Sequence, residues 1–194
     1  MHFKERTLTL LFAITITATS AAYGQDAIDR LQPLVETTAQ RLSIARQVAL
    51  AKWDSGAGVE DLSREAQVIA SAVRDADSKG LDSSSVSNFF GAQIEANKVV
   101  QYSLLADWNR SGRAPTHAPI DLVSSIRPEL DRIQITLIAE MADTTTIRAT
   151  ATCRTDVAKA IGKYASVHKS DVGPLQRIAL DRALAASCTL SHHP

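Results

Sequence analysis

Residues 26–53 read DAIDRLQPLVETTAQRLSIARQVALAKW, and this stretch decides the fold class. No glycine interrupts it, and its apolar residues recur every three or four positions: Ile28, Leu31, Leu34, Val35, Leu42, Ala45, Val48 and Ala49. This period is typical of an amphipathic helix, and Pro33 lies near its predicted beginning. The stretch therefore predicts one long helix, which the glycines of SGAG at residues 55–58 end.

Helical periodicity continues through the rest of the chain. Residues 133–135 and 144–152 weakly favour strands, but neither has a hairpin turn or a partner strand, so helices are preferred. Residues 111–119 hold one glycine and two prolines and are the predicted linker. The prediction is a single all-α domain of about six helices. After the first, the predicted helices are residues 59–79, 82–109, 126–141, 156–168 and 174–187. Asp82 or one of residues 83–85 would cap the helix at 82–109, and Ser124 or Ser125 would cap the helix at 126–141.

The first 24 residues have the pattern of a secretory signal peptide. Lys4 and Arg6 precede an uncharged, mainly apolar run at residues 8–18, and AYG at residues 22–24 offers small residues for cleavage before Gln25. No later stretch reaches about 18 uncharged apolar residues, which argues against a membrane-spanning protein. We therefore expect an exported protein, periplasmic or secreted, whose mature domain is residues 25–194.

Composition and charge exclude several classes of protein. Lys plus Arg and Asp plus Glu both number 21, which argues against a strongly basic nucleic-acid binder. The chain is 45% hydrophobic and 5% aromatic, which favours helices over disorder. Cys153 and Cys188 are the two cysteines, and after export they most simply form one disulfide. No histidine or cysteine spacing resembles a zinc site, so no metal is predicted.

The unusual feature is a set of cations among apolar residues. Arg41 and Lys52 are 11 positions apart, so on one helix they share a face at about 16 Å along the axis and could bracket a small anion. Arg64 adds a third cation on the second helix, with Asp61 one turn before it. Asn97 and Gln101 form an i, i+4 polar pair on the third helix. Spacing alone also permits ordinary surface positions for all of them.

These residues resemble the secreted, gamma-subclass, all-α chorismate mutases over nearly the whole mature chain. The similarity rests on RLSIARQVALAKW at residues 41–53, DLSR at 61–64, QI at 93–94, Asn97, QYS at 101–103, DW at 107–108, Arg127 followed by LD at 130–131, and the pair Cys153 and Cys188, which fits the family's C-terminal disulfide. The resemblance implies a homodimer in which each protomer carries its own site.

The resemblance also implies an activity, an isomerase reaction of aromatic amino acid biosynthesis that converts chorismate to prephenate without a cofactor. It implies that Arg41 and Arg127 bind the substrate carboxylates, and that Lys52 contacts a carboxylate and the ether oxygen. Gln101 would donate a hydrogen bond to that oxygen, and Asn97 would help hold a carboxylate. Arg64 would be a further clamp with Asp61 beside it, which completes the set of predicted substrate-binding residues.

The chemistry suits such residues, because a pericyclic rearrangement needs no nucleophile or metal. It needs a dianion held in a compact conformer and fixed donors at the ether oxygen, where negative charge develops. The partner of the substrate hydroxyl stays open between Asp61, Glu65 and Gln67, since the position where relatives place Gln or Glu is Val68 here. The alternative function is a non-catalytic periplasmic helical module that binds a small anion or a partner protein.

Overall fold

The computed structural model describes residues 19–189, and all the regular structure in that part of the chain is helical. The fold class predicted from the sequence is therefore confirmed. The first predicted helix is divided in two, and a single helical turn is added near the C-terminus. The elements are α1 (Thr19–Ser43), α2 (Ala45–Ser55), α3 (Leu62–Asp77), α4 (Ser83–Ser111), a π-helical turn (Leu122–Ile126), α5 (Arg127–Asp143), α6 (Thr145–Arg148), α7 (Cys153–Val167) and α8 (Pro174–Leu184).

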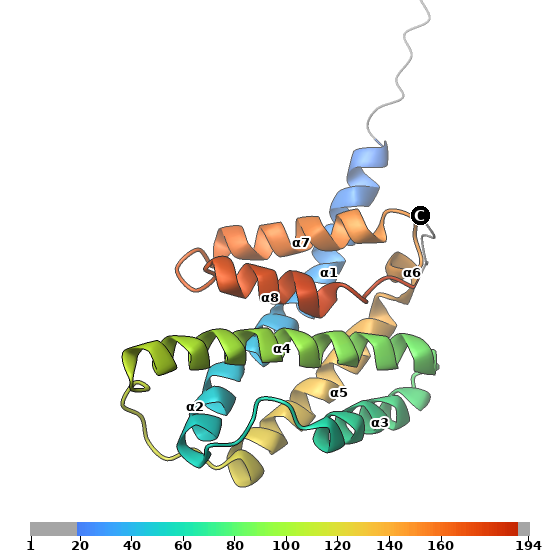
Figure 1. The fold of residues 1–194 in the computed structure, drawn as a ribbon. Helices are drawn as coiled ribbons and strands as arrows, with labels where there is room; N and C mark the ends of the chain where they lie inside the picture. The colour runs from blue at the N-terminus through green and yellow to red at the C-terminus, as the bar shows by residue number, and fades with distance from the viewer. Residues whose placement is uncertain (1–18, 190–194) are drawn as a thin grey trace, which may run out of the picture.

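The long helix α4 is the centre of the arrangement (Figure 1). Helices α7 and α8 lie on one side of it, and α2, α3 and α5 lie on the other, while α1 runs behind and connects the two sides. The main core contains Leu34, Phe89, Phe90, Leu137 and Leu180, which are at most 1% exposed. Burial of these large apolar side chains is the main favourable contribution to folding.

A second, smaller apolar cluster fixes α2 against the C-terminal half of α4. Ala49, Leu50 and Trp108 are buried there, and Trp53 packs edge to face on Trp108 with ring centroids 6.0 Å apart. Aromatic pairs favour this geometry. The contact turns the α2 face that bears Lys52 toward α4.

The prediction of one continuous helix over residues 26–53 is wrong at Ile44, where α1 ends and α2 begins. The Ser43 hydroxyl donates to the Gln40 carbonyl at 2.7 Å. Such back-bonding competes with the helical ladder and often bends a helix. Helix α1 also begins earlier than predicted, at Thr19, so Pro33 lies inside it rather than near its start. The predicted signal peptide, residues 1–24, falls mostly outside the described residues.

Helix α3 begins three residues later than predicted, because the Asp61 carboxylate accepts the backbone N–H of Arg64 at 3.0 Å and caps the helix there. Leu62, the first residue of α3, is 73% exposed. The residues of α3 that are fully buried are Ala72 and Ala76, whose small side chains fit a close helix contact. Helix α4 begins as predicted after Asp82, which accepts the Ser85 N–H, and runs two residues beyond the predicted end.

The segment before α5 also differs from its prediction. Neither Ser124 nor Ser125 caps a helix; instead Asp121 accepts the N–H groups of Val123 and Ser124 and starts the π-helical turn. That turn leads directly into α5, with Arg127 as its first residue and Pro128 in its first turn. The residues from 112 to 121 are irregular, which confirms the predicted linker.

The C-terminal region folds around buried polar contacts. Thr144 and Thr145, in the stretch with weak strand character, donate their hydroxyls to carbonyls of the last turn of α5, where the helix ends. One turn of helix, α6, follows. Its last residue, Arg148, is 1% exposed and donates to the carbonyls of Met141 and Ser187. Helix α7 begins three residues before its predicted start, and α8 ends three residues before its predicted end.

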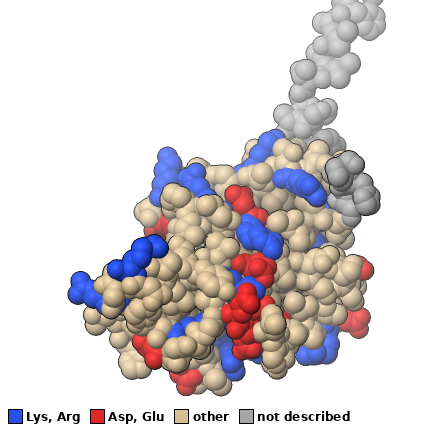
Figure 2. Space-filling view, in the orientation of Figure 1, with Lys and Arg blue, Asp and Glu red and all other residues tan. Residues whose placement is uncertain are grey.

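The surface carries charges of both signs. On the face drawn in Figure 2, acidic side chains gather near the middle among basic ones, and most of the area is neutral. No large field of one sign forms on that face, in keeping with the equal numbers of acidic and basic residues. Among the residues that the structure describes, no helix is long and apolar enough to cross a membrane.

The predicted disulfide is confirmed between Cys153 and Cys188, whose Cα atoms are 5.9 Å apart. It joins the start of α7 to the segment after α8, a sequence separation of 35 residues. Reduction should lower the free energy of unfolding by roughly 4 kcal/mol, because a loop of this length is released in the unfolded chain. We expect denaturant titration of the oxidised and reduced protein to show this difference. Activity at low temperature should change little, since neither cysteine lines the cavity described below; equal stability of the two forms would refute the prediction.

Candidate active site

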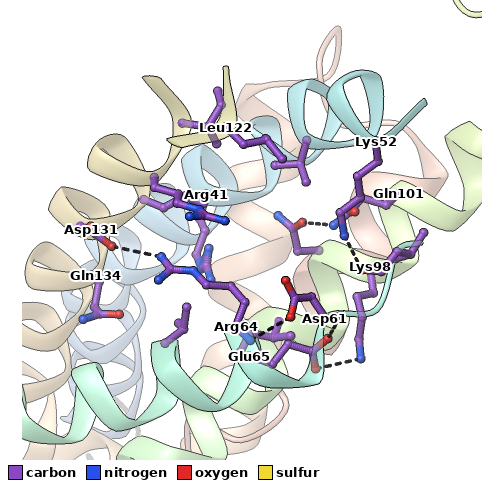
Figure 3. Close-up of a pocket in the computed structure, with 18 residues that line it drawn as sticks. Arg41, Lys52, Asp61, Arg64, Glu65, Lys98, Gln101, Leu122, Asp131 and Gln134 are labelled. Atoms are coloured by element: carbon purple, nitrogen blue, oxygen red, sulfur yellow. Dashed lines mark hydrogen bonds and ion pairs between the residues drawn. The ribbon is translucent and has the colours of Figure 1, made fainter. Parts of the chain in front are cut away.

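One cavity of about 160 Å³ lies between the end of α1, α2, α3, α4, the π-helical turn and α5. All seven predicted substrate-binding residues line it: Arg41, Lys52, Asp61, Arg64, Asn97, Gln101 and Arg127. They come from five helices that are distant in the sequence, and Figure 3 shows the labelled members converging on one space. The structure thus brings together every residue of the predicted set, while the role of each in binding stays a prediction.

Arg41 lies in the last turn of α1 and is 7% exposed, with its guanidinium directed into the cavity (Figure 3). Burial, and then repulsion from Arg64, lower the pKa of Arg41 to about 10, so the group is still charged at neutral pH. A buried cation is costly unless an anion compensates it. The buried, charged guanidinium of Arg41 therefore favours the binding of an anionic ligand in the cavity.

Lys52 reaches the cavity from α2, and its ammonium donates a hydrogen bond to the Val59 carbonyl. Partial burial lowers its pKa below the usual lysine value, and the carboxylates of Asp61 and Glu65 oppose this shift. An ammonium has three donor hydrogens. Two of them remain for a ligand in the cavity.

Arg64 on α3 and Arg127 at the start of α5 add two further cations to the lining. Arg64 forms a long ion pair with Asp131, with Nη2 and Oδ1 3.8 Å apart, and Asp131 lies one turn after Arg127 on α5. The side chain of Asp131 is 65% exposed, so this pair is worth little and leaves Arg64 able to contact a ligand. Asp131 was not among the predicted site residues, although its i, i+4 spacing from Arg127 was a usable signal.

Asn97 and Gln101 form the predicted polar pair on α4. Gln101 Nε2 donates to Asn97 Oδ1 at 2.6 Å. Gln101 is 4% exposed and Asn97 is 8% exposed. Each amide nitrogen carries two hydrogens. The bond between them uses one, so the pair keeps donors for a ligand from both residues. Gln101 Oε1 is buried without a hydrogen-bond partner.

The three candidates for a hydroxyl contact separate in the structure. Gln67 is exposed and is not part of the cavity lining, whereas Asp61 and Glu65 both line it. Glu65 Oε1 accepts the backbone N–H of Asp61 at 3.2 Å, and Glu65 Oε2 accepts from Lys98 at 3.2 Å. Asp61 uses Oδ1 to cap α3. Asp61 and Glu65 are therefore the two remaining candidates for the partner of the substrate hydroxyl.

Lys98 and Gln134 are lining residues that the sequence reasoning missed. Lys98 is 8% exposed and pairs with Glu95 at 2.7 Å, an i, i+3 spacing that could have indicated it. Gln134 on α5 donates to Asp75 of α3 at 2.8 Å, a contact between distant segments that no local pattern reveals. The rest of the lining is mainly apolar, including Val48, Val68, Ile94, Leu122, Ile126 and Leu130.

The charge of the cavity selects its ligand. Five lining residues are cationic and three are acidic, which leaves two positive charges in excess. Arginine and lysine in a partly apolar cavity suit a compact dicarboxylate. Among the described residues that line it there is no serine, cysteine or histidine to act as a nucleophile. Within the same part of the chain, no three His, Cys, Asp or Glu side chains are grouped to hold a metal ion.

Comparison with known proteins gives consistent results. The family profile of chorismate mutase type II matches residues 25–102. The secreted chorismate mutase of Mycolicibacterium smegmatis is 35% identical over 179 residues, which cover 92% of this chain and 96% of the relative. The crystal structure of chorismate mutase from Burkholderia phymatum superposes with a TM-score of 0.80 at 43% identity, over 84% of this chain and 99% of that one.

A second crystal structure, chorismate mutase from Burkholderia thailandensis, has a TM-score of 0.76 at 33% identity and covers 82% of this chain and 99% of its own. The relatives are thus matched over nearly their whole length, and the matched part of this chain contains the cavity with its cations. The chain belongs to the chorismate mutase family, in the group of secreted all-α members.

Proposed function

We propose that this protein rearranges chorismate to prephenate in the cavity between α2, α3, α4 and α5. The observation that carries the proposal is the convergence of Arg41, Lys52, Arg64, Arg127 and Gln101 on one small, partly apolar space. Family membership supports it, since the relatives carry the name of this activity. The reaction forms one C–C bond while one C–O bond breaks within a single molecule, so no atom is gained or lost.

Binding is the first task of the site. The substrate is a dianion, and we assign one carboxylate to Arg41 with Asn97, and the other to Arg127 with Lys52. Arginine presents a planar pair of donors that matches a carboxylate. Holding both carboxylates forces the two reacting ends together, which removes an entropic part of the barrier. The apolar lining residues, among them Val48, Ile94 and Leu122, would exclude water from the ring of the substrate.

Stabilisation of the transition state is the second task. As the C–O bond breaks, negative charge grows on the ether oxygen, and we assign Lys52 and Gln101 as the donors that face it. Fixed donors lower the barrier because they interact more strongly with the transition state than with the substrate. Arg64 adds positive potential, and Asp61 or Glu65 would accept from the substrate hydroxyl.

A turnover assay tests the function directly. We expect the purified exported protein to consume chorismate and to form prephenate in equal amounts without added metal or cofactor. The Lys79→Ala variant, changed at an exposed position after α3, is the matched control and should behave as wild type. Saturable binding of chorismate without turnover would instead identify the non-catalytic anion-binding module, and an absence of both would refute any role for the cavity in binding this substrate.

Family membership also supports proposals about the destination of the protein and its assembly. The relatives are named secreted proteins, and the chain begins with the pattern of a signal peptide, so we propose export to the periplasm or beyond. We also propose a homodimer, which the resemblance of the sequence supports. Sedimentation of the mature protein should give twice the mass of the chain, and the mass of a single chain at all concentrations would exclude the dimer.

A further inference from the structure

Lys98 is a lining cation whose ammonium is surrounded by three carboxylates of the protein itself. It lies on α4 directly after Asn97 and is 8% exposed. Its ammonium is 2.7 Å from Glu95, 3.2 Å from Glu65 and 4.0 Å from Glu60. The hydrogen bond to Glu95, together with the hydrogen bond and charge of Glu65, raises the pKa of Lys98, although burial opposes the shift. Lys98 thus stays charged throughout the ordinary pH range.

The contact with Glu65 joins α4 to the beginning of α3. Glu65 Oε2 accepts from Lys98, while Oε1 accepts the backbone N–H of Asp61, so both oxygens of this carboxylate are engaged (Figure 3). Tyr102, one turn after Lys98, donates to Glu60 at 3.4 Å. Helix α4 therefore holds the segment from Glu60 to Glu65, which contributes Asp61 and Arg64 to the cavity.

Glu65 poses an electrostatic problem for a site that binds a dianion. It lines the cavity, so its negative charge faces the same space as the ligand. Lys52 and Asp61 also act on that space from α2 and the α3 cap, and Arg64 acts from α3 itself. Lys98 is the cation in hydrogen-bond contact with Glu65. Without it, Glu65 would repel the ligand and would be free to pair with Lys52, the proposed donor to the ether oxygen.

We propose that Lys98 is a positioning residue of the active site, which turns Glu65 onto the N–H of Asp61, fixes the first turn of α3 and cancels the charge of Glu65 toward the substrate. The inference rests on the proposed function for its kinetic consequence, and on the contacts of Lys98 and Glu65 for its geometric one. This proposal differs from a role of Lys98 in stability alone, because it assigns the effect of Lys98 to its contact with Glu65 and not to its contacts with Glu95 and Glu60.

The kinetic test compares Lys98→Met in three backgrounds. In the wild-type background we expect kcat/KM for chorismate to fall about 30-fold to 100-fold near neutral pH, mostly through KM, because the charge of Glu65 then faces the substrate without its partner. In a Glu65→Gln background the same change should cost less than about threefold. In a Glu95→Gln background the full loss should persist, because Glu95 pairs with Lys98 but does not line the cavity.

Two controls accompany the series. Lys98→Arg keeps the charge and should stay within a few-fold of wild type. Lys163→Met removes an exposed lysine that pairs with Asp29, and since neither residue lines the cavity it should change nothing. Circular dichroism of every variant checks that helical content is retained. Equal losses in all three backgrounds would show a structural role only and overturn the proposal.

A second measurement does not depend on turnover. Hydrogen exchange of the ligand-free protein should show that Lys98→Met speeds exchange of the Asp61 amide, whose acceptor is Glu65, while Lys163→Met does not. If wild type fails to turn over chorismate, the proposed function is refuted, and this exchange experiment still decides the positioning role. Unchanged exchange in Lys98→Met would reject that role whatever the activity.

Discussion

Lys52→Ala is expected to reduce kcat/KM for chorismate at least about a thousandfold, which corresponds to about 4 kcal/mol of lost transition-state stabilisation. The change removes a charged donor proposed to face both a carboxylate and the ether oxygen, and loss of one fixed donor alone costs about a hundredfold to a thousandfold. The measurement is steady-state kinetics near neutral pH, with helical content and melting temperature recorded alongside.

The structure adds a condition to this prediction. Lys52 donates to the Val59 carbonyl before α3, so its removal could also loosen that segment. Arg41→Ala tests the same site without touching that contact, and it too should lose most of the activity. Lys79→Ala should retain activity. Lys52 and Arg41 variants that keep activity within a few-fold, while folded, would show that the proposed cations do not form the site.

Wild-type activity should itself depend on pH in a defined way. Burial lowers the pKa of Lys52 below that of an exposed lysine. Lys52 is therefore charged at neutral pH and loses its proton as the pH rises into the alkaline range. We therefore expect a flat profile around neutrality and a decline on the alkaline side, within the range where the protein stays folded.

Gln101→Glu should reduce kcat/KM on the order of a thousandfold near neutral pH and recover part of it as the pH falls. A glutamine amide carries donor hydrogens at every ordinary pH, whereas a glutamic acid donates only while protonated. Its carboxylate would repel the developing charge on the ether oxygen and compete for Lys52. It would also face Asn97 Oδ1, the acceptor that Gln101 now bonds at 2.6 Å.

The pH at which the recovery begins depends on the surrounding charges. Arg41, Lys52 and Arg64 favour the carboxylate and oppose protonation, so the recovery should begin only well into the acidic range. The quantity to follow is the ratio of variant to wild-type kcat/KM across pH. Gln101→Met, which has no donor and no titratable group, should give a low but flat ratio. A Gln101→Glu ratio that stays flat or falls on acidification would place Gln101 away from the ether oxygen.

Several features could be predicted from the sequence because their causes are local. Apolar residues at helical spacing predicted six helices, the first of which is divided into α1 and α2 in the structure. Asp82 marked the start of α4, and the glycines after α2 and α4 marked the ends of those helices. The i, i+4 spacing of Asn97 and Gln101 predicted their contact. Export together with two cysteines predicted the disulfide. The choice of site residues came from resemblance, since spacing alone favoured an ordinary surface position for each cation.

Other local predictions failed where side chains compete with the backbone. The Ser43 hydroxyl bonds a carbonyl of the preceding turn at the break between α1 and α2, and apolar periodicity does not register such a bond. Asp61 and Asp121 took the capping positions because their carboxylates reach backbone N–H groups, although the apolar pattern continues before Asp61 and serines were available after Asp121.

What the sequence by itself determined is the class of the fold, the order of its helices and the types of residue in the site. What only the tertiary structure decided is which side chains meet across them. Lys98 meets Glu65, 33 residues away, and Arg64 meets Asp131 on a helix beyond the linker. The small residues Ala72 and Ala76 are fully buried on α3, which packs against α4. Such contacts depend on how close two helices approach and at what angle, which side-chain volumes on both surfaces determine together, and a pattern read along one helix contains only one of the two surfaces.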